Sequence, residues 1–519
     1  MSDLLAVPVA VDRRMPFQRW AIRVGLAAFA ILLLVNLSKM LRYVAYTTGY
    51  PYSLDYGEGI VWQQMLNIVA GKGYQPIGVF PAIVYHYPPV YHLTTAAVAA
   101  IFGMDGLYAG RWVSFLCTVV TMVLSGVLAA SAVPRDETRA VRICVALTAG
   151  FCLTSCYPVA KWSALMRVDM LATAFSLAGL LLVIRAPARR SAIVAAAILF
   201  VLAIYTKQTS IAAPAASFLG LLVVRPKAAF LLLAVCLALG LSALGWLSAA
   251  SDGGFLRHII LYNINRLDLS TWQSMAWTLL AHGNILVVSG IGAFFALRRL
   301  REGGMAGLRE RCERDARLLA LLILLIFLLL KTVLLLAMLK SGSADNYMVE
   351  WFTAVAIFLA LALMPALRIA FGHEGRMSTI LTVFVVLGLP IHAYQVETFG
   401  HSRRASSVQR DALAHVVDEI RASPKPVISD DMTLLIRAGR PVLWEPAITA
   451  ELSHAGLYDD KAFAAKVRRG DFGFFVTEGD RGDLLYDSRY NPVVADAIDA
   501  AYPRREYIPS RLMLHLPAR

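Results

Sequence analysis

The sequence is poor in charged residues for a chain of its length. Only 16% of its 519 residues are Asp, Glu, Lys or Arg, whereas a soluble protein carries about a quarter. This excludes an ordinary soluble globular protein. Hydrophobic residues make up 58% of the chain and the mean hydropathy is +0.62. Apolar runs near the roughly 20 residues needed to cross a bilayer recur along it, so the composition predicts a polytopic membrane protein.

The sequence also has few cysteines, no internal repeat and no small-residue cleavage site after its first apolar run. None of the six cysteines lies beyond residue 396, so no disulfide framework is expected in the C-terminal part. Cys152 and Cys156 share a helix face, but no His accompanies them, and packing explains them better than a metal. The lack of repeats counts against transporters built from repeated halves. The missing cleavage site favours an uncleaved membrane anchor over a signal peptide.

The apolar runs predict about eleven membrane spans. Charged turns separate most of them, and the tightest connection runs from Thr206 to Thr209. A further amphipathic stretch, 90–102, is expected to lie on the membrane surface. The predicted spans cover about 21–37, 107–130, 143–157, 165–184, 191–205, 208–224, 228–249, 276–297, 318–339, 350–367 and 379–394.

Lys and Arg are concentrated in alternate loops. If the N-terminus is cytoplasmic, the basic loops all fall on the cytoplasmic side and hold roughly twenty Lys and Arg, against fewer than ten in the longer opposite loops. This predicts that the first loop, 42–106, and residues 397–519 lie in a periplasm-like compartment. Orientation and anionic lipid explain the net charge of +14 better than nucleic acid does. The basic loops are 134–142, 185–190, 225–227, 298–317 and 368–376.

From about residue 397 the composition becomes that of a soluble domain. Leu413, Val416, Val417 and Ile420 follow helical spacing. Four short runs read as strands separated by helical segments, which predicts a small α/β domain. We found no glycine-rich phosphate loop in this part. The sequence therefore predicts a membrane module over 1–396 and a soluble external domain over 397–519, with strands at 426–429, 441–444, 472–476 and 512–516.

The first loop carries two carboxylates, Asp55 and Glu58, on either side of a Tyr-Gly pair. Acidic side chains beside a membrane span are costly without a partner or a function, so both are candidate functional residues. The alternative is a helix start in which Asp55 is the N-cap and Glu58 completes a capping box. The spacing alone does not choose between them.

More polar side chains lie at the predicted outer ends of spans. Arg167 and Asp169 are two residues apart, so they need not pair with each other on a helix. Lys207 could be a substrate ligand, or it could extend to the membrane interface as an anchor. Together these groups place cations and carboxylates on one side of the membrane, which favours an anionic substrate. The candidate binding residues are Tyr87, Arg167, Asp169, Lys207, Gln208, Arg257, Arg266, Asn346, Tyr347 and Glu350.

Several motifs resemble those of a known superfamily. They are DYGEG, GKGY and YPP in the first loop, then RVDMLA, YTKQTSIAAP and DNYMVE. With the many spans and the external α/β domain, the chain resembles the bacterial GT-C glycosyltransferases, in particular the group of protein O-mannosyltransferases and lipid A aminoarabinose transferases. Many relatives have an adjacent Asp-Glu pair where this chain separates Asp55 from Glu58. The resemblance therefore leaves open which of the two is the catalytic carboxylate.

The resemblance implies a multi-pass protein of the bacterial inner membrane and a transferase of the hexosyl or pentosyl class. The expected reaction moves a sugar from a polyprenyl-phosphate donor to a hydroxyl of an envelope lipid, glycan or protein at the periplasmic face. Asp55 or Glu58 would be the base, and Lys207, helped by Arg257 or Arg266, would hold the phosphate. No cofactor is required; a divalent metal is possible but not indicated, and no nucleic-acid partner is expected. The alternative is a lipid-linked-sugar flippase or another transporter, although its ionisable residues should lie near span centres.

Overall fold

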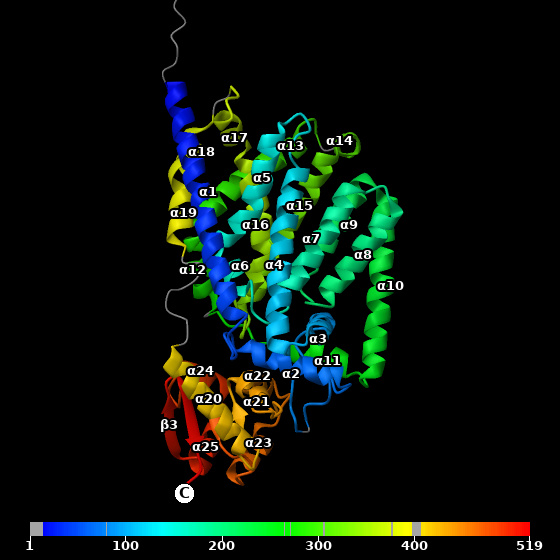
Figure 1. Ribbon diagram of the computed structural model, residues 1–519. Helices are drawn as coiled ribbons and strands as arrows, with labels where there is room; N and C mark the ends of the chain where they lie inside the picture. The colour runs from blue at the N-terminus through cyan, green and yellow to red at the C-terminus, as the bar shows by residue number, and fades with distance from the viewer. Residues whose placement is uncertain are drawn as a thin grey trace, which may run out of the picture.

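The computed structural model describes residues 14–518, except 79, 264, 270, 305–306, 375–376 and 397–405. A bundle of long helices forms the upper part of the molecule in Figure 1. Helices α2 (Gly57–Val69) and α3 (Val90–Phe102) of the first loop lie across its lower end with α11 (Gly254–Ile259). The C-terminal sheet and its helices lie below these three, so the first loop separates the bundle from the C-terminal part.

Helices occur over all the stretches predicted to span the membrane. Six of the described helices are long and apolar enough to cross a bilayer, so eleven crossings stay a prediction. All residues of α16 (Met348–Ala362) are buried, which makes it the central helix of the bundle. The described α-helices of the bundle besides α16 are α1 (Arg14–Thr47), α4 (Gly106–Ser131), α5 (Arg139–Cys152), α6 (Tyr157–Trp162), α7 (Asp169–Arg185), α8 (Arg190–Ile204), α9 (Ala212–Val224), α10 (Pro226–Ala250), α12 (Thr271–Ala281), α13 (Gly283–Arg301), α14 (Leu308–Arg314), α15 (Ala316–Leu334), α17 (Met364–Ala370), α18 (Thr379–Val383) and α19 (Leu389–Gln395). Among these, α16 packs against α4, α5, α7, α13 and α15.

Several predicted spans are interrupted. The stretch 276–297 is divided between α12 and α13, and the stretch 350–367 between α16 and α17. Pro365 lies in the first turn of α17, where its missing N–H is tolerated but would break a continuing helix. Between α18 and α19 the chain makes a π-helical turn over Phe384–Gly388, and Pro390 follows in the first turn of α19. The sequence thus predicted where the apolar segments lie but not where they break.

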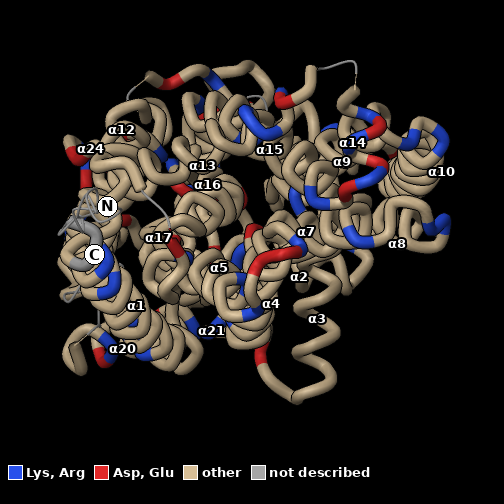
Figure 2. The backbone as a smooth tube through the Cα atoms, turned by 90° about the horizontal axis from the view of Figure 1, so that it is seen from above, with Lys and Arg blue, Asp and Glu red and all other residues tan. Residues whose placement is uncertain are grey.

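The basic turns lie together at the end of the bundle away from the C-terminal sheet (Figure 1). Arg368 pairs there with Glu137 of a neighbouring turn. Figure 2, viewed from this end, shows Lys and Arg at α8, α10 and α14, around the edge of the bundle. The separation of basic turns from the first loop agrees with the charge pattern, while the compartments on each side stay predictions.

The C-terminal part contains a four-stranded sheet in the order β1-β2-β4-β3. β1 pairs parallel with β2, and the other pairs are antiparallel, with Phe475 opposite His515 and Tyr507 opposite Met513. The strands are β1 (Ile428–Ser429), β2 (Phe475–Glu478), β3 (Arg504–Ile508) and β4 (Leu512–Leu516). The accompanying helices are α20 (Ser407–Ala422), α21 (Met432–Arg437), α22 (Pro446–His454), α23 (Asp460–Arg468), α24 (Leu484–Arg489) and α25 (Pro492–Ala501).

Three of the four predicted strands overlap strands of this sheet. The fourth, 441–444, is wrong as a sheet strand, because Trp444 instead forms an isolated bridge with Ala82 of the first loop. The prediction missed β3, whose sequence RREYI is mostly exposed and lacks an apolar run. The proposed boundary at residue 397 lies outside the described residues.

The first loop and the C-terminal part share a hydrophobic core. Tyr50 and Ile60 of the first loop belong to one buried cluster with Leu413, Val416 and Leu434. Backbone bonds add to this contact, since the N–H of Ala82 donates to the carbonyl of Leu443 at 2.8 Å. The C-terminal part is therefore held against the first loop, and cavities between them are lined by both.

Candidate functional site

A cavity of about 240 Å³ lies where the helix bundle, the first loop and helix α22 meet. Six of the predicted binding residues line it, although they come from four separate stretches of sequence. The lining residues that matter below are Tyr56, Gly57, Tyr87, Arg167, Lys207, Gln208, Lys340, Asn346, Tyr347 and Glu445. A smaller cavity is lined by Asp169 and Glu350 and shares Lys207, Asn346 and Tyr347 with it.

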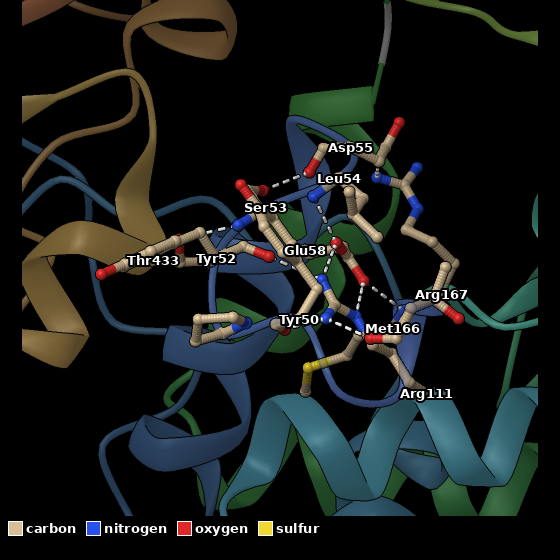
Figure 3. Close-up of polar contacts among 12 residues, drawn as sticks. Tyr50, Tyr52, Ser53, Leu54, Asp55, Glu58, Arg111, Met166, Arg167 and Thr433 are labelled. Atoms are coloured by element: carbon tan, nitrogen blue, oxygen red, sulfur yellow. Dashed lines mark hydrogen bonds and ion pairs between the residues drawn. The ribbon is translucent and has the colours of Figure 1, made fainter. Parts of the chain in front are cut away.

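Glu58 is completely buried and fully hydrogen bonded (Figure 3). Its Oε1 accepts from Arg111 Nε and the Met166 N–H, both at 2.8 Å. Its Oε2 accepts from Arg111 Nη2 at 2.7 Å and the Leu54 N–H at 2.8 Å. Arg111 is equally buried and donates to three backbone carbonyls of the first loop, those of residues 47, 50 and 52. This geometry ties the first loop to α4 and leaves Glu58 poorly placed to take a proton from a substrate.

Asp55 lies in a different environment, with 21% of its side chain exposed. Its Oδ2 accepts from Arg167 Nη1 at 2.9 Å and from the Gly57 N–H at 3.0 Å. Neither bond uses Oδ1, for which no partner occurs among the described residues. The predicted capping box is not formed as expected, because the N-cap of α2 is Tyr56, without a side-chain cap bond. Asp55 is thus oriented by a cation through Oδ2.

The two glycines of the DYGEG motif allow close approach. A Cβ on Gly57 would lie 1.4 Å from Nη1 of Arg167, and one on Gly59 would lie 2.7 Å from the Thr433 N–H. A side chain at either position would displace its neighbour. The spacing of the motif therefore follows from contacts on both sides of α2, with Arg167 and with the start of α21.

Asp169 and Lys207 form a second ion pair beside the cavity. Lys207 Nζ lies 2.5 Å from Asp169 Oδ1, which also accepts from Asn346 Nδ2 at 3.0 Å. Lys207 Nζ is also 4.6 Å from the centre of the Tyr347 ring, within the range of a cation–π contact. The lysine is buried and held by the site, so it does not extend to water as an interface anchor would.

Arg167 also links Asp55 to the aromatic residues of the site. Its Nη2 donates to the Tyr87 hydroxyl at 3.4 Å, and its guanidinium lies 5.1 Å from the centre of the Trp162 ring. Gln208 donates from Nε2 to the carbonyl of His86 at 2.8 Å, which holds the turn after α8 against the first loop. As the sequence indicated, Arg167 and Asp169 have separate partners.

The remaining predicted residues of the DNYMVE motif are paired at the bundle end. Glu350 accepts from Lys331 Nζ at 2.9 Å, and both side chains are buried. Asp345 accepts from Lys161 Nζ and Trp162 Nε1, both at 2.9 Å. Glu350 lines the smaller cavity, so this motif contributes to the site through its ion pairs and through Asn346.

Two predicted cations lie outside the cavity. Arg257 is exposed and donates to the carbonyl of Asp252 at 2.9 Å. Arg266 is 57% exposed and pairs with Glu451 at 3.3 Å. Asn263 and Asn265, from the same loop, do line the cavity.

Sequence reasoning missed three residues that define the site, namely Arg111, Lys340 and Glu445. Arg111 had a usable signal, since a charge inside an apolar helix demands a partner. Lys340 lines the cavity, and it has no ion pair among the described residues. Glu445 comes from the C-terminal part, and no local pattern connects it to a cavity at the membrane module.

A second cavity lies on the other side of Asp55, between the first loop and the C-terminal sheet. Its acidic lining residues are Asp55, Asp430, Asp431 and Glu478, and Tyr56 lines both cavities. Burial raises the pKa of Asp431 to about 6. Arg489 pairs with both Asp430 and Glu478, at 3.1 and 3.0 Å. Asp55 thus lines this second cavity, whereas its partner Arg167 lines the cavity of about 240 Å³.

Among the described residues, no group of three or more His, Cys, Asp or Glu side chains is arranged to hold a metal ion. The carboxylates around Asp55 are instead engaged with Arg and backbone N–H donors.

Comparison with known proteins identifies the fold. No family model and no curated protein sequence matches the chain. The apo structure of ArnT from Cupriavidus metallidurans matches with a TM-score of 0.55 and 14% identity over 90% of this chain and 95% of that chain. The same protein bound to undecaprenyl phosphate matches at 0.52, with 14% identity over 86% and 92%. The Archaeoglobus fulgidus oligosaccharyltransferase matches at 0.53, with 12% identity over 88% and 69%. These are GT-C glycosyltransferases, and the predicted GT-C fold is confirmed.

Proposed function

We propose that this chain, which has the GT-C fold, is a membrane glycosyltransferase that uses a polyprenyl-phosphate-linked sugar. The reaction moves the sugar to an acceptor hydroxyl at the periplasmic face of a bacterial inner membrane. The observation that carries the proposal is the pairing of a cation-lined cavity with an Arg-oriented carboxylate. ArnT, which has the same fold, binds undecaprenyl phosphate, and that ligand chemistry fits the cations described above.

The donor phosphate would lie against the cations of the cavity of about 240 Å³, which we call the donor cavity. Lys207 is fixed by Asp169 and Tyr347, so its ammonium is positioned before a ligand arrives. Arg167 adds a planar guanidinium, and Lys340 an ammonium without an ion-pair partner among the described residues. Charge-assisted bonds to phosphate oxygens stabilise the charge that grows as the sugar–phosphate bond breaks. Arg257 and Arg266 have no part in this arrangement.

Asp55 would act as the general base. The acceptor hydroxyl approaches from the second cavity and gives its proton to Asp55 while its oxygen bonds to the anomeric carbon. The bond from that carbon to the phosphate oxygen breaks, and the lipid phosphate leaves with the electron pair. Arg167 contacts Asp55 and lines the donor cavity, so it orients the base beside the leaving phosphate. Glu58 is assigned to positioning, because Arg111 and two backbone N–H groups occupy its oxygens.

The test is a transfer assay with purified protein in liposomes that contain a polyprenyl-phosphate sugar. Asp55→Asn should lower turnover by about a hundredfold or more, as expected for loss of a general base. Yield and thermal stability should stay unchanged, because Asp55 is partly exposed. Asp418→Asn, an exposed acid on α20, is the matched control and should keep full activity.

Two outcomes would contradict the proposal. Full transfer activity in Asp55→Asn would remove the base from the mechanism. Wild-type protein that moves a lipid-linked sugar across the bilayer without transferring it would favour the flippase alternative. Product analysis by mass spectrometry, combined with a probe of donor orientation in the liposomes, separates these cases.

A further inference from the structure

Glu445 is a buried acid that lines the donor cavity. It precedes α22 at the N-cap position, yet its side chain makes no cap bond with that helix. The residue is 4% exposed, and its Oε2 has no hydrogen-bond partner among the described residues. An unpaired buried acceptor is destabilising, so such groups in native proteins call for an explanation. The carboxyl lines the cavity of about 240 Å³, where a ligand could complete its hydrogen bonds.

Contacts on both sides hold Glu445 against the first loop. The N–H of Val442 donates to Gln63 Oε1 at 2.9 Å, three residues before it. The N–H of Ala447 donates to the Tyr56 hydroxyl at 3.3 Å, two residues after it. The stretch 442–447 is therefore fixed to α2 and its N-cap, and the position of Glu445 does not depend on the C-terminal sheet alone.

Gln208 provides a second acceptor in the same cavity. Gln208 Oε1 is buried and has no partner among the described residues, while its Nε2 is held by the carbonyl of His86. Lys340 adds an ammonium without an ion pair in the described part of the chain. A ligand that satisfies all three must offer hydrogen-bond donors to Glu445 and Gln208 and negative charge to Lys340. A hydroxylated sugar attached to a phosphate has this combination.

We propose that Glu445 binds a hydroxyl of the donor sugar, and that this sugar is uncharged rather than an amino sugar. The proposal rests on the function proposed above and specifies its substrate class. Arg167 lines the same cavity as Glu445, and the guanidinium of Arg489 lies 4.1 Å from the centre of the Tyr56 ring, which lines that cavity too. These two cations disfavour a third, an ammonium group of the ligand, at the same place. A hydroxyl can donate to Oε2 without adding charge, so it fits this environment.

The protonation of the acid agrees with a neutral partner. Burial raises the pKa of Glu445 to about 8, although Arg167 and Arg489 act in the opposite direction. At neutral pH a large share of the side chain is therefore a carboxylic acid, which can both donate to a hydroxyl and accept from one. The C-terminal part would thus contribute a residue that touches the substrate.

The experiment compares variants of the full-length protein in liposomes by steady-state transfer. Donors are undecaprenyl-phosphate glucose and the same lipid carrying a 4-amino sugar, and undecaprenyl phosphate alone serves as a competitive inhibitor. Glu445→Ala should raise the KM for the glucose donor roughly tenfold, as loss of one well-placed hydrogen bond predicts. The inhibition constant of undecaprenyl phosphate should not change, because that ligand has no sugar. Glu445→Gln keeps the shape and hydrogen bonds of the protonated acid and should stay within about twofold of wild type.

Matched variants separate binding from folding. Glu506→Ala removes an exposed acid from β3 and should change neither constant. If Glu445→Ala cannot be purified, Glu445→Asp withdraws the carboxyl by one methylene while retaining its chemistry and should also raise the donor KM. An unchanged donor KM in both variants would overturn the inference. An equal weakening of undecaprenyl phosphate would also overturn it, because that result indicates a purely structural role.

The failures of the two proposals are distinguishable. Wild-type protein that transfers sugar from neither donor refutes the proposed function, and the inference with it. Wild-type protein that transfers only the 4-amino sugar supports the transferase and overturns the assignment of an uncharged sugar. Transfer from the glucose donor with an unchanged KM in Glu445→Ala and Glu445→Asp leaves the transferase intact and removes Glu445 from sugar binding.

Discussion

Replacing Glu58 with Gln asks whether this carboxylate supports the fold or the chemistry. The amide would retain the shape of the side chain, but its –NH2 group would face N–H donors that the carboxylate now accepts from. Arg111 would stay buried without its counter-ion. Removing one partner of a buried ion pair lowers the free energy of unfolding by about 3–5 kcal/mol. The two charge-assisted bonds from Arg111 to Glu58, at about 1.5–3 kcal/mol each, sum to about 3–6 kcal/mol, which is similar. We therefore expect a clear loss of stability.

The assay is thermal unfolding of the purified variant in detergent, followed by transfer measurements below the unfolding temperature. Glu58→Gln should unfold several degrees below wild type, and Asp55→Asn should not. Arg111→Gln should destabilise about as much as Glu58→Gln, and the double variant should cost less than the sum of the two, because both single changes remove one interaction. If Glu58→Gln unfolds at the wild-type temperature but turns over about a hundredfold more slowly, Glu58 is the base and our assignment of Asp55 is wrong.

Three further predictions concern Lys207, Glu445 and the orientation of the chain. Lys207→Met leaves Asp169 buried without its cation, so it should lower stability and should lower donor use by roughly ten- to a hundredfold. Compared with Lys207→Met, Lys207→Arg should recover more of the stability than of the donor use. Equal recovery of both would assign the lysine to structure alone. Burial raises the pKa of Glu445 from 4.5 to about 8, and the charged or titratable groups near it are Arg167, Arg489 and Tyr56. The stability of the wild-type protein relative to Glu445→Gln should therefore be greatest below about pH 4.5. This advantage should be lost as the pH rises towards 8, and a flat difference in unfolding temperature across this range would contradict the burial argument. Alkaline phosphatase fused to the C-terminus should be active and a fusion after Arg301 inactive, and the reverse pattern would overturn the orientation.

The sequence by itself determined the membrane class, the apolar segments and the separation of basic loops from the first loop. These properties depend on local composition, since each helix that crosses a bilayer satisfies its own backbone hydrogen bonds. The strands at 426–429, 472–476 and 512–516 could also be predicted, because their side chains are mostly apolar and buried. The strand β3 could not, because its sequence RREYI lacks an apolar run.

Only the tertiary structure decided which polar side chain meets which partner. Asp55 and Glu58 are three residues apart, yet one contacts Arg167 beside two cavities and the other is enclosed by Arg111. Glu445 reaches the site because the C-terminal part packs on the first loop. These pairs join residues that lie from 53 to 391 positions apart in the sequence and come into contact only in the folded chain. Local spacing therefore identified the acidic loop and six of the residues that line the donor cavity, while long-range packing determined which partners these side chains have.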